Sequence, residues 1–301
     1  MELEAAWRVR VITPKLKSGG FLLKRAEQHE SGNTITLRAG DEFLGYETAP
    51  YGVEARAEGG VGVRHYQFTP HDTRDWDAAH VPVLTDFEWQ GRKRKAMLFA
   101  NKNGLLYALD RATGQFLYGK PFVEVNWMDG FDEKGRPVEV MGRIGGAEKA
   151  MTLPGVATNW QPPSYSPATG LFYVSSWERG TVDGRMERPS PAYGAMRAFD
   201  PKTGIKKWEF KKSDAVFHTG ALSTASGLLF TGIWGDYYSG DAAASLLDGY
   251  FYALDANTGH LLWQMSLAGS VYGGPMTYSV RGKQYVAVAA GNTLFAFALR
   301  Q

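Results

Sequence analysis

Cysteine is absent from the 301 residues of this sequence. Its absence excludes disulfides, thiolate metal ligands and cysteine nucleophiles. It leaves the redox compartment open, because a chain without cysteine tolerates any compartment. Long apolar runs are also absent: no stretch approaches the ~18 residues of a membrane-spanning helix. The beginning, MELEAAWRVRVITPK, lacks the apolar core of a signal peptide. Either the protein is cytosolic or the chain lacks its natural beginning.

An excess of charge of one sign is missing too. The formal net charge is +2, so nothing favours nucleic acid or an anionic membrane as a partner. Long segments with a 3.6-residue apolar period are lacking, which argues against helical repeats. In contrast, 36 glycines and 13% aromatic residues are typical of many short strands joined by tight turns.

One pattern recurs three times along the chain. An alternating apolar run leads to an Asp, then Thr-Gly, then an aromatic residue four positions after the Gly. The copies are LYALDRATGQFLY at 106–118, MRAFDPKTGIKKW at 196–208 and FYALDANTGHLLW at 251–263. The pattern predicts a hairpin, since Asp can bond turn amides and Gly supplies positive φ. The aromatic residue of the second strand must then dock on a neighbouring element.

The spacing of the repeats predicts the architecture. The anchors Asp110, Asp200 and Asp255 lie 90 and 55 residues apart. A four-stranded blade needs roughly 40–50 residues, so we interpret 90 as two blades, with SYSPATGLFYVSS at 164–176 as a degenerate middle copy. The interval of 55 is one blade with an insertion at 233–249. We therefore expect an all-β fold: a partial β-propeller of about four antiparallel blades over residues 61–301.

Residues 1–60 do not show this repeat and form an unassigned β-rich segment: a degenerate blade, a small separate β unit, or foreign sequence fused to the front.

The segment HYQFTPHDTRDWDAAHVPVL at 65–84 carries three close carboxylates, Asp72, Asp75 and Asp77. Such carboxylates repel one another unless a cation or strong donors lie among them. Hard cations such as Ca²⁺ collect carboxylate oxygens in this way, and a neighbouring base could then take a proton from a substrate hydroxyl. The alternative is an acidic surface turn with ordinary ion-pair partners.

From about His65 to Leu299 the chain resembles the C-terminal half of the pyrroloquinoline quinone (PQQ)-dependent alcohol dehydrogenases, the methanol and ethanol dehydrogenase type. The resemblance is carried in family order by six motifs: HYQFTPHDTRDWDAA, ANKNGLLYALDRATG, VNWMDGFDEKGRPVEV, TNWQPPSYSPATGLFYV, LSTASGLLFTG and GGPMTYSVRGKQYVAVAAGN. It implies an eight-bladed propeller with the quinone and a metal ion near its axis.

The resemblance also implies residue roles. Asp75 matches the catalytic base and a metal ligand, and Asp77 matches the extra carboxylate of members that use a lanthanide in place of Ca²⁺. Lys102 matches the cation that bonds the reactive quinone oxygen, and Asn159 and Trp160 match a pair at the cofactor rim. Without the motif, Lys102 is a solvated hairpin-tip lysine, Asn159 a turn cap and Trp160 a packing residue.

By the same resemblance we expect oxidation of an alcohol or sugar, cytochrome c or a quinone as electron acceptor, and a periplasmic location. The N-terminal half of such enzymes normally supplies further quinone and metal contacts that residues 1–60 do not match. Two hypotheses remain: an oxidoreductase or its catalytic part, and a non-catalytic propeller piece that binds no quinone alone and serves as a scaffold. An uncovered blade face would favour self-association.

Overall fold

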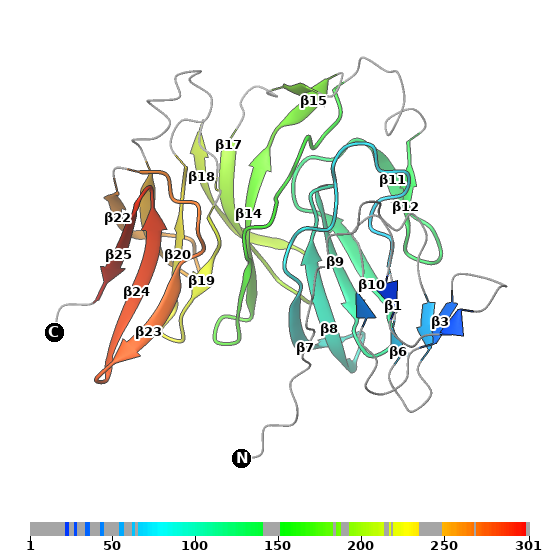
Figure 1. Ribbon diagram of the computed structural model, residues 1–301, viewed down its shortest axis with the longest axis horizontal. Coiled ribbons are helices and arrows are strands. Elements are labelled where there is room, and N and C mark those ends of the chain that lie inside the picture. Colours follow the sequence, from blue (N-terminus) through cyan, green and yellow to red (C-terminus); the bar gives the residue numbers. More distant parts are fainter. Residues whose placement is uncertain are drawn as a thin grey trace. The chain divides into compact units, whose positions relative to one another are not determined.

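The structure is a computed structural model of the chain (Figure 1). It describes residues 66–140, 151–182, 185–187, 193–213, 217, 219–234, 249–267 and 269–298, together with short strands within 22–63. Two compact units are present, residues 1–67 and 68–301. No helix long and apolar enough to cross a membrane occurs in the part of the chain that is described.

The described residues of the first unit form six short strands. They are β1 (Leu22–Leu23), β2 (Glu27–Gln28), β3 (Thr34–Thr36), β4 (Phe43–Leu44), β5 (Glu54–Arg56) and β6 (Gly62–Val63). Strand β1 pairs with β4, and a second sheet has the order β2-β3-β5-β6, in which β3 and β5 run parallel. The unit is therefore β-structured, but a parallel pair does not fit a propeller blade.

The residues described in the second unit form three four-stranded antiparallel sheets and one three-stranded sheet, apart from two small hairpins. The first blade is β7 (Val83–Trp89), β8 (Arg92–Ala100), β9 (Leu105–Asp110) and β10 (Phe116–Pro121). The second is β13 (Ser164–Ser166), β14 (Leu171–Glu178), β17 (Tyr193–Phe199) and β18 (Lys206–Ser213). The third is β19 (Leu222–Ser223), β20 (Leu228–Gly232), β21 (Tyr250–Asp255) and β22 (Leu261–Ser266), and the fourth is β23 (Met276–Val280), β24 (Lys283–Ala290) and β25 (Thr293–Phe297).

Two small hairpins are inserted between these strands. One, β11 (Met128–Phe131) with β12 (Pro137–Glu139), follows the first blade. The other, β15 (Gly180–Val182) with β16 (Arg185–Glu187), follows β14 within the second blade.

The repeated turns form as the sequence predicts. In each of the first three blades, the repeated turn joins the third strand to the fourth. The Asp side chain of the turn accepts hydrogen bonds from backbone N–H groups. Asp110 Oδ1 accepts from Ala112 at 2.9 Å and from Thr113 at 3.1 Å. Burial opposes ionisation of Asp110, but these amides and the Arg94 guanidinium hold its pKa below the usual value. The Asp of the pattern is thus a built-in cap of the turn.

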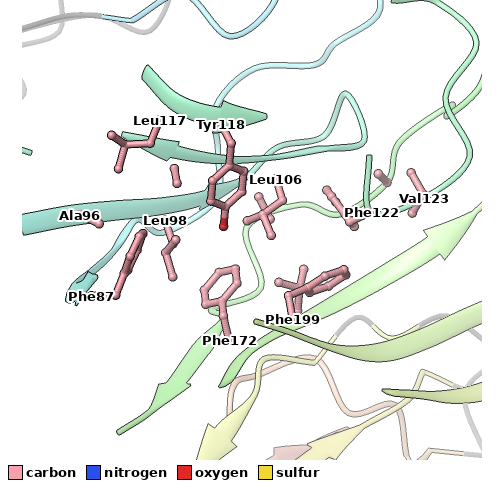
Figure 2. Close-up of a cluster of buried hydrophobic side chains, with 14 residues drawn as sticks. Phe87, Ala96, Leu98, Leu106, Leu117, Tyr118, Phe122, Val123, Phe172 and Phe199 are labelled. Atoms are coloured by element: carbon pink, nitrogen blue, oxygen red, sulfur yellow. The ribbon is translucent and has the colours of Figure 1, made fainter. Parts of the chain in front are cut away.

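The aromatic residue of each of the first two repeats docks on the turn of the next blade. The Tyr118 hydroxyl donates to the carbonyl of Pro201 at 2.8 Å, and Trp208 Nε1 donates to Ala256 O at 3.1 Å. Figure 2 shows Tyr118 and Leu106 of the first blade facing Phe172 of the second within one buried cluster. Successive sheets therefore pack face to face through interlocked aromatic residues, and the all-β propeller prediction is confirmed.

The repeat count needs a correction. Asp110 and Asp200 lie in consecutive blades, so their 90-residue spacing is one blade plus an insertion, not two blades. The copy at 164–176 is the turn between the first two strands of the second blade, where Ser166 takes the position of Asp. The error arose because the turn between the first two strands of a blade and the turn between the last two, which lie at the same end of the sheet, resemble each other in sequence. The insertion predicted at 233–249 lies mostly outside the described residues.

Candidate active site

Three segments of the second unit meet at one end of the first two blades. They are the stretch before β7, the loop from β8 to β9, and the stretch before β13. The amide of Ala157 donates to Lys102 O at 2.9 Å, and Trp76 Nε1 donates to Gly155 O at 2.7 Å. The indole of Trp127 donates to Asn103 O at 2.8 Å. Buried indoles therefore fix three loops that are distant in sequence against one another.

Lys102 pairs with two of the three carboxylates that the sequence singles out. Its Nζ lies 3.4 Å from Asp75 Oδ2 and donates a hydrogen bond to Asp77 Oδ1. The residue is only 6% exposed, so the solvated hairpin-tip alternative is wrong. A buried ammonium needs anionic partners. Asp75 and Asp77 supply them, so the three side chains form one charged cluster.

Asp75 and Asp77 differ in how they meet the solvent. The Asp75 side chain is 85% exposed, against 35% for Asp77. The backbone of Asp75 has φ of 61°, the left-handed region, which costs a residue with a side chain about 1–2 kcal/mol. Strain of this kind is retained where the surrounding structure imposes it, often at functional sites. Asp75 thus presents an open carboxylate on a fixed backbone.

Asp72 belongs to the fold of the loop. Its Oδ1 accepts from Arg74 N and its Oδ2 from Trp76 N, each at 2.8 Å. Burial raises the pKa of Asp72 above its usual value, although these two amides oppose the rise. Asp72 therefore shapes the turn that carries Asp75.

Asn159 and Trp160 follow directly after the segment bonded to Lys102. The Asn159 side chain accepts a hydrogen bond from the amide of Trp160 at 2.9 Å. Trp160 is 47% exposed, so the packing alternative does not describe it. An aromatic ring that stays half in solvent beside a charged cluster is available to stack on a flat ligand.

Sequence reasoning missed two buried polar residues beside this cluster, His80 and Arg179. Burial lowers the pKa of His80 to about 4, partly opposed by the backbone of Gln161 and Ala100. Neither ring nitrogen of His80 reaches hydrogen-bonding geometry with a described residue. Arg179 is 5% exposed at the end of β14. The only sequence signal for Arg179 is its position directly after a largely apolar strand, in FYVSSWER.

The donor set at this end of the blades suits an anionic, acceptor-rich molecule. It combines two buried cations, Lys102 and Arg179, with the half-exposed ring of Trp160. Asp75 and Asp77 are suitable ligands for a hard cation, which takes 6–8 oxygens when it is Ca²⁺. In the described part of the chain, no group of three or more His, Asp or Glu side chains could hold a metal ion. Asp75 and Asp77 by themselves do not make up such a group.

An all-β propeller with a buried ion-paired cluster at one end of its blades is the class defined by these observations. Within that class the chain matches the family model described as "Glucose/ethanol/alcohol dehydrogenase, beta-propeller domain", of the PQQ type, over residues 53–129 and 212–286. The chain belongs to the PQQ-dependent alcohol dehydrogenase family. PQQ together with a calcium or lanthanide ion is the cofactor set of this family.

The relatives cover the second unit well. A cytochrome c-linked 1-butanol dehydrogenase of Thauera butanivorans is 33% identical over 269 residues, which is 79% of this chain and 37% of that protein. A lanthanide-dependent methanol dehydrogenase of Methylacidiphilum fumariolicum is 32% identical over 255 residues, 75% of this chain and 39% of that protein. The solved quinohemoprotein alcohol dehydrogenase of Pseudomonas putida HK5 superposes with a TM-score of 0.65 at 30% identity, covering 78% of this chain and 38% of that structure. The chain thus spans less than two fifths of the length of these relatives.

Proposed function

We propose that this chain carries the base and part of the quinone and metal site of a PQQ-dependent alcohol dehydrogenase. The observation that supports it most is the buried Lys102 bridging Asp75 and Asp77. Family membership alone does not assign roles to residues, but an unusual charged cluster at the motif positions favours these three. The substrate class is an alcohol or a sugar, the electron acceptor cytochrome c or a quinone, and the location periplasmic.

Each residue has a role that follows from its surroundings. Asp75, the open carboxylate, accepts the hydroxyl proton of the substrate. Lys102 donates a hydrogen bond to the reactive oxygen of the quinone and stabilises the negative charge that develops there. Asp75 and Asp77 hold the metal ion, and Asn159 and Trp160 contact the rim of the cofactor. When bound, PQQ accepts the hydride from the alcohol carbon.

Titration with PQQ tests the proposal directly. The 301-residue chain is mixed with PQQ and La³⁺ or Ca²⁺, and binding is followed by quenching of tryptophan fluorescence. We expect weak binding without alcohol-dependent dye reduction, because the described residues supply only part of a metal site. Lys102→Met should weaken binding by about 10-fold or more, since a charge-assisted hydrogen bond is worth ~1.5–3 kcal/mol. Asp129→Asn, at an exposed carboxylate of β11, is the matched control and should leave binding unchanged.

The alternative function is a propeller piece that keeps the family sequence but binds no quinone. It is favoured by the absence of a complete metal-ligand group among the described residues. Equal quenching by PQQ in the native chain and in Lys102→Met, or no quenching at millimolar PQQ, would support this scaffold. Submicromolar binding with turnover by a monomer would instead mean that the chain holds a complete site.

A further inference from the structure

Among the residues that the structure describes, Arg179 is a buried cation without a carboxylate partner. Its Nε is buried and makes no hydrogen bond, and no carboxylate of a described residue lies within ion-pair distance of its guanidinium. The guanidinium instead lies over the ring of Trp177, 4.6 Å from its centroid. A buried charge is costly unless an anion accompanies it, and a cation–π contact compensates only in part.

The same blade provides a contrast. Arg197 is also buried, but Glu178 and Glu209 each accept a hydrogen bond from it at 2.6 Å, and the Phe122 carbonyl accepts one at 2.7 Å. Arg197 therefore satisfies its charge internally and links the first two blades. Arg179 has the burial of a structural arginine without its carboxylates.

Arg179 also lies at the end of the blades that carries the cluster. Its carbonyl accepts from Gly155 N at 2.6 Å, and the next pair along the same ladder joins Trp177 N to Ala157 O at 2.8 Å. Ala157 N in turn donates to Lys102 O. The backbone of Ala157 thus lies between those of Lys102 and Trp177 and is hydrogen-bonded to both. With about 5 Å for each hydrogen-bonded neighbour, the backbones of Lys102 and Trp177 are about 10 Å apart. A flat molecule the size of a tricyclic quinone spans such a distance.

We propose that Arg179 is an anion-binding residue of this site and that its ligand is a carboxylate of the quinone cofactor. This inference rests on the proposed function, and PQQ is a tricarboxylate as well as a quinone. Lys102 holds the redox end of the molecule, and Arg179 holds a carboxylate at a distance from it. Arginine suits this task, since its planar fork matches a carboxylate in a bidentate manner.

The first test needs no ligand. Arg179→Met keeps the apolar stem and removes the charge, and Arg197→Met does the same at the paired arginine. Thermal unfolding of the free chain should show Arg179→Met as stable as the native chain or more stable, and Arg197→Met clearly less stable. A loss of stability in Arg179→Met that matches the loss in Arg197→Met would show that the chain itself supplies the anion, and would overturn the inference.

The second test uses three probes: PQQ, its trimethyl ester and benzene-1,3,5-tricarboxylate. The native chain should bind PQQ and the benzene tricarboxylate more tightly than the uncharged ester. Arg179→Met should weaken binding of the two anions by about 10- to 100-fold, and Arg179→Lys should restore part of it.

The outcomes separate the two proposals. Equal PQQ binding by the native chain and Arg179→Met overturns the role of Arg179 and leaves the proposed function standing. Binding of the benzene tricarboxylate that depends on Arg179, without PQQ binding, supports the anion site and counts against the quinone function. No binding of either anion overturns both.

Discussion

Charge at the cluster is unevenly distributed over its residues. The Lys102 side chain is buried, the Asp75 side chain is exposed, and the exposure of Asp77 lies between the two. Both carboxylates accept hydrogen bonds from the Lys102 ammonium. The ammonium therefore occupies the carboxylate oxygens that a metal ion would also use. Under the proposed function, a metal ion would compete with the Lys102 ion pairs for Asp77, and substitutions of single residues can measure this competition.

The first prediction concerns lanthanide binding. Tb³⁺ should bind at Asp75 and Asp77. Its luminescence should be sensitised by the buried Trp76, the residue between the two aspartates in the sequence. Asp77→Asn should weaken Tb³⁺ binding by about 10-fold or more, because one lost charged contact is worth ~1.5–3 kcal/mol. Lys102→Met should strengthen it, since a competing cation is removed. Tb³⁺ luminescence titration measures both, and Ca²⁺ should displace Tb³⁺ poorly. Unchanged Tb³⁺ affinity in Asp77→Asn would contradict the assignment.

A second prediction concerns the pH dependence of stability through His80. Burial lowers the pKa of His80 from 6.5 to about 4. Between pH 4 and pH 6.5, His80 is therefore protonated in the unfolded chain and neutral in the folded chain. Stability is therefore full above pH 6.5 and falls as the pH drops towards 4, by up to about 3 kcal/mol from this residue. His80→Phe should lose this part of the pH dependence in urea unfolding at pH 7 and pH 5. His71→Asn, at an exposed position in the same loop, should keep it.

At the scale of elements, the chain is built from turns that serve two purposes. The third-to-fourth-strand turn closes one blade and receives the aromatic residue of the blade before it. Gly259 has φ of 73°, and a Cβ at this position would lie 2.5 Å from Trp208 Cε3. Glycine is thus required here by the backbone and by the docked ring together.

These two requirements can be separated by a pair of substitutions. Gly227 has φ of 82° with no atom closer than 4.0 Å to a built Cβ, so Gly227→Ala tests backbone strain alone. Gly259→Ala should cost about 1–3 kcal/mol more than Gly227→Ala, because the indole of Trp208 must move from its contact with Ala256. Urea unfolding measures the difference. Equal losses would show that docking of Trp208 does not depend on close approach to the turn.

Turn chemistry explains how much of the fold was predictable from the sequence. The Asp and Gly of the repeat stabilise the turn through local contacts, so the hairpins could be predicted from the sequence. The docking of Tyr118 and Trp208 on a neighbouring element could be predicted from their positions in the repeat. Blade counting failed because SYSPATG, the turn between the first two strands of its blade, resembles the turn between the third and fourth strands. Arg179 and His80 escaped notice because burial depends on tertiary packing, which no local pattern records.

At the scale of the whole molecule, the last blade differs from the others. All five residues of β23 are exposed, as is Leu294 of β25, at 73%. The neighbouring β22 exposes further apolar side chains, among them Trp263, which packs only on Phe251 and Phe297 among the described aromatic residues. Tyr118 and Trp208 each dock on the turn of a following blade, and Trp263 makes no such contact with the residues described.

Exposed apolar side chains gathered on neighbouring strands favour association, since contiguous apolar patches larger than a few hundred Å² are rare on monomers. We predict that the purified chain self-associates through β22, β23 and β25. Sedimentation velocity should show oligomers that increase with concentration, and Met276→Lys combined with Leu294→Lys should shift the chain towards the monomer. Ile205→Lys, at an isolated exposed apolar residue of a second-blade turn, is the matched control and should change nothing. A native chain that stays monomeric at high concentration would show that this face is covered within the chain.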